Sequence, residues 1–150
     1  MHKEIVSIHC KADLDAIIYK NDLGILRKYL LVESPISKSD RIVKLAHEIE
    51  NSSNATCILE AKLDIGRRAK RIEIVAKDKK QLRIFKITSQ KSLDRDALDL
   101  DQSLTFINER YESSGLVFFA TLVTDVMPSS TIVDSIKKSL LNQMEFIQYG

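Results

Sequence analysis

The chain has 150 residues, 44% hydrophobic and 29% charged, with a net charge of +2, a composition typical of one globular domain, residues 1–150, and unlike that of disordered chains. Its two cysteines, Cys10 and Cys57, form no CxxC pair, which argues against a disulfide framework and favours a reducing compartment. No apolar run approaches the roughly 20 residues that span a bilayer. We therefore expect a cytoplasmic protein without membrane contacts.

The N-terminal third shows helical periodicity. Apolar residues recur at helical spacing over residues 12–32, with Asn21 and Gly24 as candidate breaks, and the proline at position 35 ends this region. A second helix is expected over residues 39–50, with Ser39 as its N-cap.

The pattern then changes to a period of two, which is typical of half-buried strands. Alternating residues predict strands over residues 55–65, 71–77 and 82–88. Gly66 with the basic residues after it, and the polar run 78–81, provide the turns. Three strands joined by short polar turns form an antiparallel meander.

Helical periodicity returns at residues 92–112, where an apolar residue recurs every three or four positions. This spacing is compatible with a coiled coil but favours packing on a sheet. Residues 116–124 form a nearly continuous apolar run, which predicts a strand buried on both faces. A last helix is expected to open after Pro128 and to extend to Ile147. The predicted fold class is α/β, a three-stranded antiparallel meander plus a buried fourth strand, flanked by helices (an αβββαβ core).

Few residues suggest catalysis. The chain has three histidines and four isolated glycines, with no nucleophile elbow and no phosphate-binding loop. We predict no cofactor and no metal ion. The triplet Glu60-Ala61-Lys62 puts an acid and an amine on one strand face, as metal-dependent nucleases do, although alternating charges are common on solvated strands.

The strands of residues 71–78 and 82–88 resemble the pair of catalytic strands in the restriction-endonuclease-like superfamily, which includes Holliday-junction resolvases. The order helix, meander, helix, strand over residues 39–124 is also similar to the core of that family. The resemblance implies a metal-binding acid on the first strand, a place that Glu73 fills, and an ExK triplet on the second. Glu48 or Glu50 would be the acid of the helix.

The second strand departs from the family pattern, because Lys86 stands where the acid is expected and Thr88 where the lysine is expected. Exchanging a carboxylate for an ammonium removes a metal ligand and adds repulsion. The resemblance therefore implies an inactive relative. Were the protein an active nuclease, the candidate catalytic residues would be Glu48, Glu60, Lys62 and Glu73.

Residues 62–91, which we call the basic segment, hold 11 basic and 3 acidic residues, against 4 and 9 in residues 92–150. Such a local excess attracts phosphate backbones or acidic protein surfaces. We expect a non-catalytic protein that binds DNA through this segment or assists a DNA-processing enzyme, with a homodimeric assembly module as the alternative. The candidate binding residues are Arg67, Arg68, Lys70, Arg71, Lys77, Lys79, Lys80, Arg83 and Lys86.

Overall fold

The computed structural model describes residues 11–19, 40–65 and 68–149. Its centre is a five-stranded sheet in the order β1-β2-β3-β4-β5. The strands are β1 (Thr56–Ile65), β2 (Arg68–Lys77), β3 (Gln81–Thr88), β4 (Val117–Thr124) and β5 (Glu145–Gln148). The first three form the predicted antiparallel meander, and β4 pairs in parallel with β3 and with β5.

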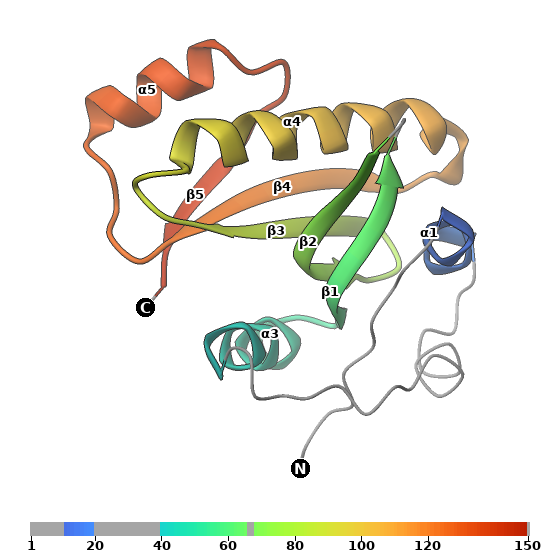
Figure 1. Cartoon of the computed structure of the whole chain (residues 1–150). Coiled ribbons are helices and arrows are strands. Elements are labelled where there is room, and N and C mark those ends of the chain that lie inside the picture. The colour runs from blue at the N-terminus through green and yellow to red at the C-terminus, as the bar shows by residue number, and fades with distance from the viewer. Residues whose placement is uncertain (1–10, 20–39, 66–67, 150) are drawn as a thin grey trace.

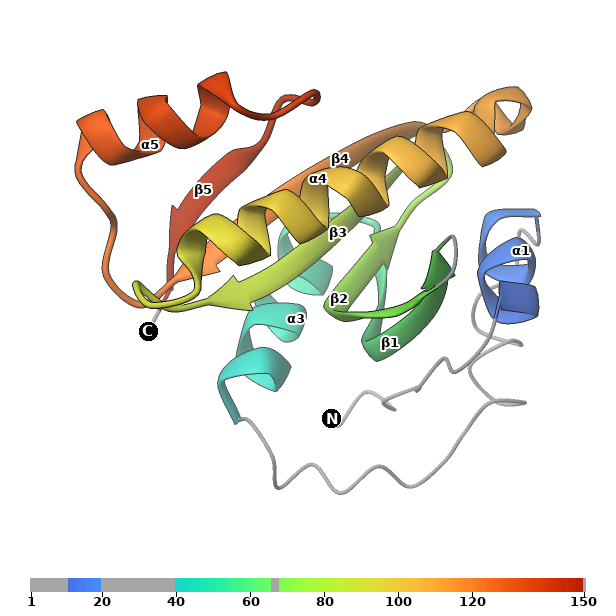
Figure 2. The ribbon, with the colours of Figure 1, turned by 45° about the horizontal axis from the view of Figure 1, so that its top comes forward.

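Helices cover both faces of the sheet, so the α/β class with an αβββαβ core is confirmed (Figure 1). On one face lies α4 (Leu93–Arg110), with α1 (Lys11–Tyr19) beside the β1–β2 hairpin; on the other lies α3 (Asp40–Ser52). The remaining helix, α5 (Ser130–Lys138), lies at the β5 side of α4 (Figure 2). Most of the helix expected over residues 12–32 lies outside the described residues.

The apolar stripe of α4 packs against the sheet. Leu93, Ala97, Leu100, Leu104 and Ile107 are all buried in the core that α4 shares with α1, β3 and β4. Packing on a sheet is therefore the correct interpretation of this stripe, and α4 keeps no apolar seam for a coiled coil.

The C-terminal region differs from the prediction. The helix expected to reach Ile147 ends at Lys138, and residues 145–148 form β5 instead. Asp101 of α4 explains the break: its buried carboxylate accepts the backbone N–H groups of Leu141 and Asn142 at 3.1 and 2.9 Å. These bonds hold residues 141–142 in a loop and deliver the following residues, from Glu145, to the edge of β4.

The expectation that β4 is buried on both faces is correct only for its second half. Residues 120–124 are buried, whereas Val117 and Phe119 are 55% and 46% exposed. β5 pairs with β4 only from Thr121 onward, and α3 contacts chiefly β1 and β2. The first half of β4 therefore has no β5 partner along one edge, and one of its faces is more exposed than in the second half.

Candidate functional site

The basic residues of this segment whose side chains the structure describes do not form one outward face, because β2 separates them into two groups. Lys70 lies near the β1–β2 turn and Lys79 follows the other end of β2. At the ordinary strand rise, nine residues place these two positions about 30 Å apart. The described cations of the basic segment therefore lie in two separate groups.

The group near the β1–β2 turn is partly neutralised. Lys70 forms an ion pair with Asp99 of α4 at 2.9 Å, with the two side chains 20% and 33% exposed. Arg71 is exposed, and the ammonium of Lys86 donates to the Arg71 carbonyl at 3.1 Å. Arg67 lies outside the described residues, as does the side chain of Arg68.

Lys77 is not part of a surface, contrary to the prediction. It is 6% exposed and sits opposite Thr56 of β1 and Leu82 of β3 in the sheet. Burial lowers the pKa of its ammonium, against a smaller opposing effect of Asp78. A lysine enclosed by strands on both sides cannot contact a phosphate backbone without rearrangement.

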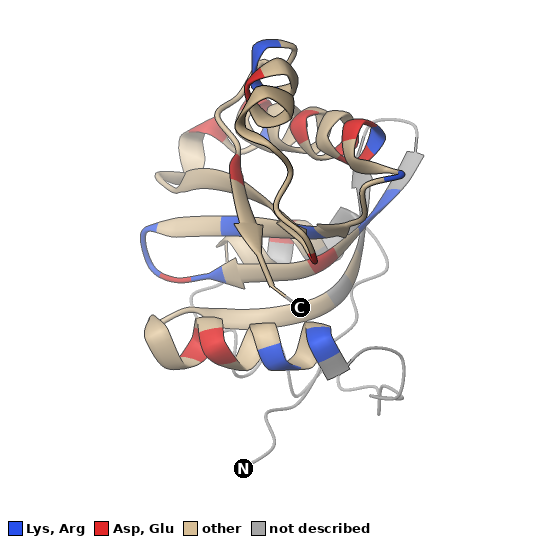
Figure 3. Ribbon diagram, turned by 90° about the vertical axis from the view of Figure 1, so that its left-hand side faces the viewer, with Lys and Arg blue, Asp and Glu red and all other residues tan. Residues whose placement is uncertain are grey.

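The group at the β2–β3 turn is open to solvent. Lys79 and Lys80 are both exposed, and the Asp78 carboxylate fixes the turn by accepting the backbone N–H groups of Lys80 and Gln81 at 2.7 and 2.9 Å. Figure 3 shows cations on both sides of a single acid at this turn, whereas on α3 the acids and the cations occupy opposite ends of the helix. This turn is therefore the clearest cationic projection of the basic segment.

Glu73 lies where β2 leaves β3. The two strands pair from Lys77↔Leu82 to Ile74↔Phe85, and beyond that point the Ile87 N–H donates to the Glu73 carboxylate at 3.3 Å. Burial raises the pKa of Glu73, while Lys86, the backbone donors and Arg71 act in the opposite direction. The half-buried carboxylate thus replaces a lost sheet hydrogen bond and faces an ammonium.

Thr88, where the family resemblance expects a lysine, is 5% exposed. Its hydroxyl donates to the carboxylate of Asp96, the first-turn acid of α4, at 2.7 Å. This buried bond ties the end of β3 to the start of α4, which is a structural use of the position.

The other candidate acids do not join Glu73 in any described cluster. Glu48 is exposed on α3, where its charge raises the pKa of Tyr149 after the larger effect of burial. The side chains of Glu60 and Lys62 lie outside the described residues. Among the side chains that the structure describes, no three His, Cys, Asp or Glu residues could hold a metal ion together.

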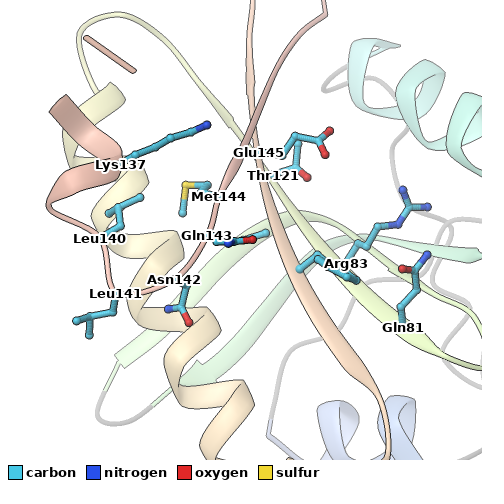
Figure 4. A pocket seen from close by; sticks show the side chains of 12 residues that line it. Gln81, Arg83, Thr121, Lys137, Leu140, Leu141, Asn142, Gln143, Met144 and Glu145 are labelled. Atoms are coloured by element: carbon cyan, nitrogen blue, oxygen red, sulfur yellow. The ribbon is translucent and has the colours of Figure 1, made fainter. Parts of the chain in front are cut away.

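A cleft of about 800 Å³ lies beside the first half of β4, and the sequence analysis missed it. β3 and β4 provide one wall, and the loop between α5 and β5 provides the other (Figure 4). The only signal in the sequence was the pair of apolar residues Val117 and Phe119 at the start of a strand. The lining residues include Arg83, Phe119, Ala120, Lys137, Met144 and Glu145.

Comparisons with protein-family models, curated proteins and solved structures gave no match for this chain. Within the described ranges, no helix has both the length and the apolar character needed to cross a membrane. The geometry above is therefore the whole basis for inferring function.

The raised pKa of Glu73 predicts a pH-dependent stability. The folded state holds this proton more tightly than the unfolded state, so its stabilising contribution is complete below pH 4.5 and is lost as pH rises through the folded pKa. We expect Glu73→Gln to remove this loss. The free energy of unfolding of variant and wild type is measured by urea titration at pH 4 to 8. The variant should gain stability relative to wild type as pH rises to the folded pKa of Glu73, and the difference should then stay constant. A difference that does not change with pH contradicts the assignment.

Proposed function

We propose that the protein binds the phosphate backbone of duplex DNA without cleaving it, as an accessory factor with a nuclease-like fold. The order α3, β1, β2, β3, α4, β4 supports this proposal, because it is the order that the restriction-endonuclease-like resemblance implies. One observation carries the non-catalytic part: Lys86, which stands where that resemblance expects a second carboxylate, is close enough to Glu73 for its charge to lower the pKa of that carboxyl, although the Lys86 ammonium donates to the Arg71 carbonyl.

An ammonium at this position opposes metal binding. A divalent cation near Glu73 would lie close to the charge of Lys86, and the half-buried setting strengthens that repulsion relative to water. Thr88 does not offset this repulsion, because its side chain is uncharged and its hydroxyl donates a hydrogen bond to Asp96. The cleavage chemistry of such sites requires the metal, so DNA bound here stays intact.

The DNA-binding part of the proposal is supported by the cations that remain accessible. Lys79 and Lys80 are exposed at the β2–β3 turn, and Arg71 is exposed toward the other end of β2. Backbone contacts of this kind position a duplex without reading its sequence. A separation of about 30 Å corresponds to roughly nine base pairs, so a 20-base-pair duplex is longer than the distance between the two groups.

Backbone binding predicts a strong dependence on salt. We expect affinity for a 20-base-pair duplex, measured by fluorescence anisotropy, to fall steeply from 50 to 200 mM salt. Lys79→Glu with Lys80→Glu should weaken binding at least tenfold and reduce the slope of log K against log salt by about 2.

The matched control is Lys44→Glu with Lys138→Glu, which changes net charge equally at two exposed lysines outside the basic segment. It should weaken binding much less than the turn variant. Affinity that ignores salt, or equal losses in both variants, would refute backbone binding through this segment. Cleavage with Mg²⁺ or Mn²⁺ that disappears in Glu73→Ala would refute the non-catalytic part.

A further inference from the structure

The first half of β4 presents a free strand edge to the cleft. The Val117 N–H donates to the Lys80 carbonyl on the β3 side, so by strand alternation the backbone groups of Phe118 and Ala120 point to the opposite edge. On that edge β5 begins to pair at Thr121, a register in which the Ala120 carbonyl accepts from the Glu145 N–H. The Phe118 N–H and carbonyl and the Ala120 N–H precede this pairing. Ala120 lines the cleft, which therefore gives access to a strand edge.

The sheet face next to this edge combines apolar and cationic groups. Phe119 is 46% exposed and pairs in register with Arg83 of β3, so both side chains lie on the same face. The Arg83 guanidinium lies over the Phe85 ring, 5.5 Å from its centroid, and its Nη2 makes a long 3.4 Å bond to Ser53. Its Nε is buried with no hydrogen-bond partner. A buried guanidinium N–H without an acceptor is costly, and a carboxylate is the acceptor that fits a guanidinium best, so a small movement of the Arg83 side chain would let a ligand carboxylate reach this Nε.

The opposite wall of the cleft is held in place. Asn142 donates to the Asp101 carboxylate and to the Thr105 hydroxyl, both at 2.8 Å, in addition to the backbone bonds at Leu141 and Asn142. Asp101 is only 2% exposed. Because α4 anchors this loop, the cleft is preformed and a ligand does not have to order it.

We propose that this cleft binds an extended acidic peptide segment of a partner protein, which adds as a strand to the free edge of β4. Main-chain pairing with the Phe118 N–H and carbonyl and with the Ala120 N–H supplies affinity, Phe119 packs against an apolar side chain, and Arg83 receives a carboxylate. Lys137 on the far wall adds a second positive charge, against the single acid Glu145. The inference goes beyond DNA binding, because its ligand and its surface are different.

The charge and shape of the cleft decide between occupants. A second copy of this chain pairing edge to edge would place the two Arg83 residues, each one strand in from its edge, three strand spacings or about 14 Å apart, with no acidic residue on the two β4 strands between them. A DNA duplex is too wide to reach a strand edge within a cleft of about 800 Å³. An extended chain is the ligand that can satisfy both the strand edge and the guanidinium.

The probe is a fluorescein-labelled heptapeptide of sequence TVEVEVT. We expect it to bind in anisotropy titrations, TVKVKVT to bind at least tenfold more weakly, and Arg83→Ala to reduce the difference between them, with Lys137 accounting for the remainder. Two further peptides carry N-methyl groups on alternate residues, one on the odd and one on the even positions. Only one of these sets of N–H groups faces β4, so we expect one of the two peptides to lose binding and the other to keep it. Hydrogen exchange at the Phe118 and Ala120 amides should slow on binding.

Two matched variants keep the test independent of the proposed function and of folding. Lys79→Ala with Lys80→Ala, which removes the turn cations without adding acids beside the cleft, should keep the preference for TVEVEVT over TVKVKVT, and exposed Lys138→Ala should behave as wild type. The proposal is overturned by absence of TVEVEVT binding, by equal binding of the acidic and basic peptides, or by retention of binding in both methylated peptides. It is also overturned if the purified chain forms a dimer, by light scattering, that Phe119→Lys dissociates, because the occupant is then a second copy.

Discussion

Asp101→Ala is expected to lower the free energy of unfolding by about 3 kcal/mol. The buried carboxylate accepts two backbone N–H groups and one side-chain N–H, from Leu141 and Asn142. Hydrogen bonds to a charged group each contribute about 1.5–3 kcal/mol, and donors left unpaired carry their full desolvation cost. Part of the loss is recovered as water enters the loosened loop, so the bonds do not add fully.

The measurement is urea unfolding at pH 7, combined with hydrogen exchange of residues 139–144. Asp101→Asn keeps the shape and one acceptor oxygen, so we expect roughly half the effect. The exposed helix-surface change Asp94→Ala serves as a control and should stay within about 0.5 kcal/mol. A cost below about 1 kcal/mol for Asp101→Ala would show that the loop does not depend on this anchor.

The strands of the meander were predictable because each buries one side only, which leaves a period of two in the sequence. β1 and β3 agree with their predicted ranges within one residue, and β2 begins earlier than expected, at Arg68. The cations at positions 68 and 70 made the first residues of β2 look like part of the turn in the sequence. β2 nevertheless begins at Arg68, because residues 68–70 each pair with a residue of β1.

The C-terminal strand was not predictable, because it depends on a contact far away in the sequence. Residues 130–147 contain apolar residues at helical spacing, and Ile136 and Met144 are indeed buried in one core. The bonds from Asp101 to Leu141 and Asn142, forty residues away, interrupt the helix. A charged residue inside a helical stripe such as that of α4 gives no local sign of this role.

The candidate site was predictable in composition but not in geometry. The charge excess of residues 62–91 is real, yet strand alternation and sheet pairing bury Lys77 and direct Lys70 to Asp99. The prediction counted charges along the chain and did not allow for the length of β2 between its two turns. The positions of Glu73 and Lys86 came from the family resemblance, and in the structure the charge of Lys86 acts on the Glu73 carboxyl.

Lys86→Glu is expected to lower the free energy of unfolding by about 2 kcal/mol at pH 7 and to make the protein responsive to Mn²⁺. Lys86 now lowers the pKa of Glu73 against the effect of burial. A second carboxylate there replaces attraction with repulsion in a half-buried setting. A divalent cation bridging the two acids relieves that repulsion, so millimolar Mn²⁺ should raise the thermal midpoint of the variant.

Lys86→Gln is the matched control, since it removes the ammonium without adding an acid. It should be less destabilised than Lys86→Glu and should not respond to Mn²⁺. Lowering the pH to 5 should also restore Lys86→Glu selectively, because one carboxyl of a close pair takes up a proton. If Mn²⁺ stabilises both variants equally, the two positions do not share a site. The likeness to a nuclease centre that has exchanged an acid for a lysine is then wrong, and the case against cleavage loses its physical basis.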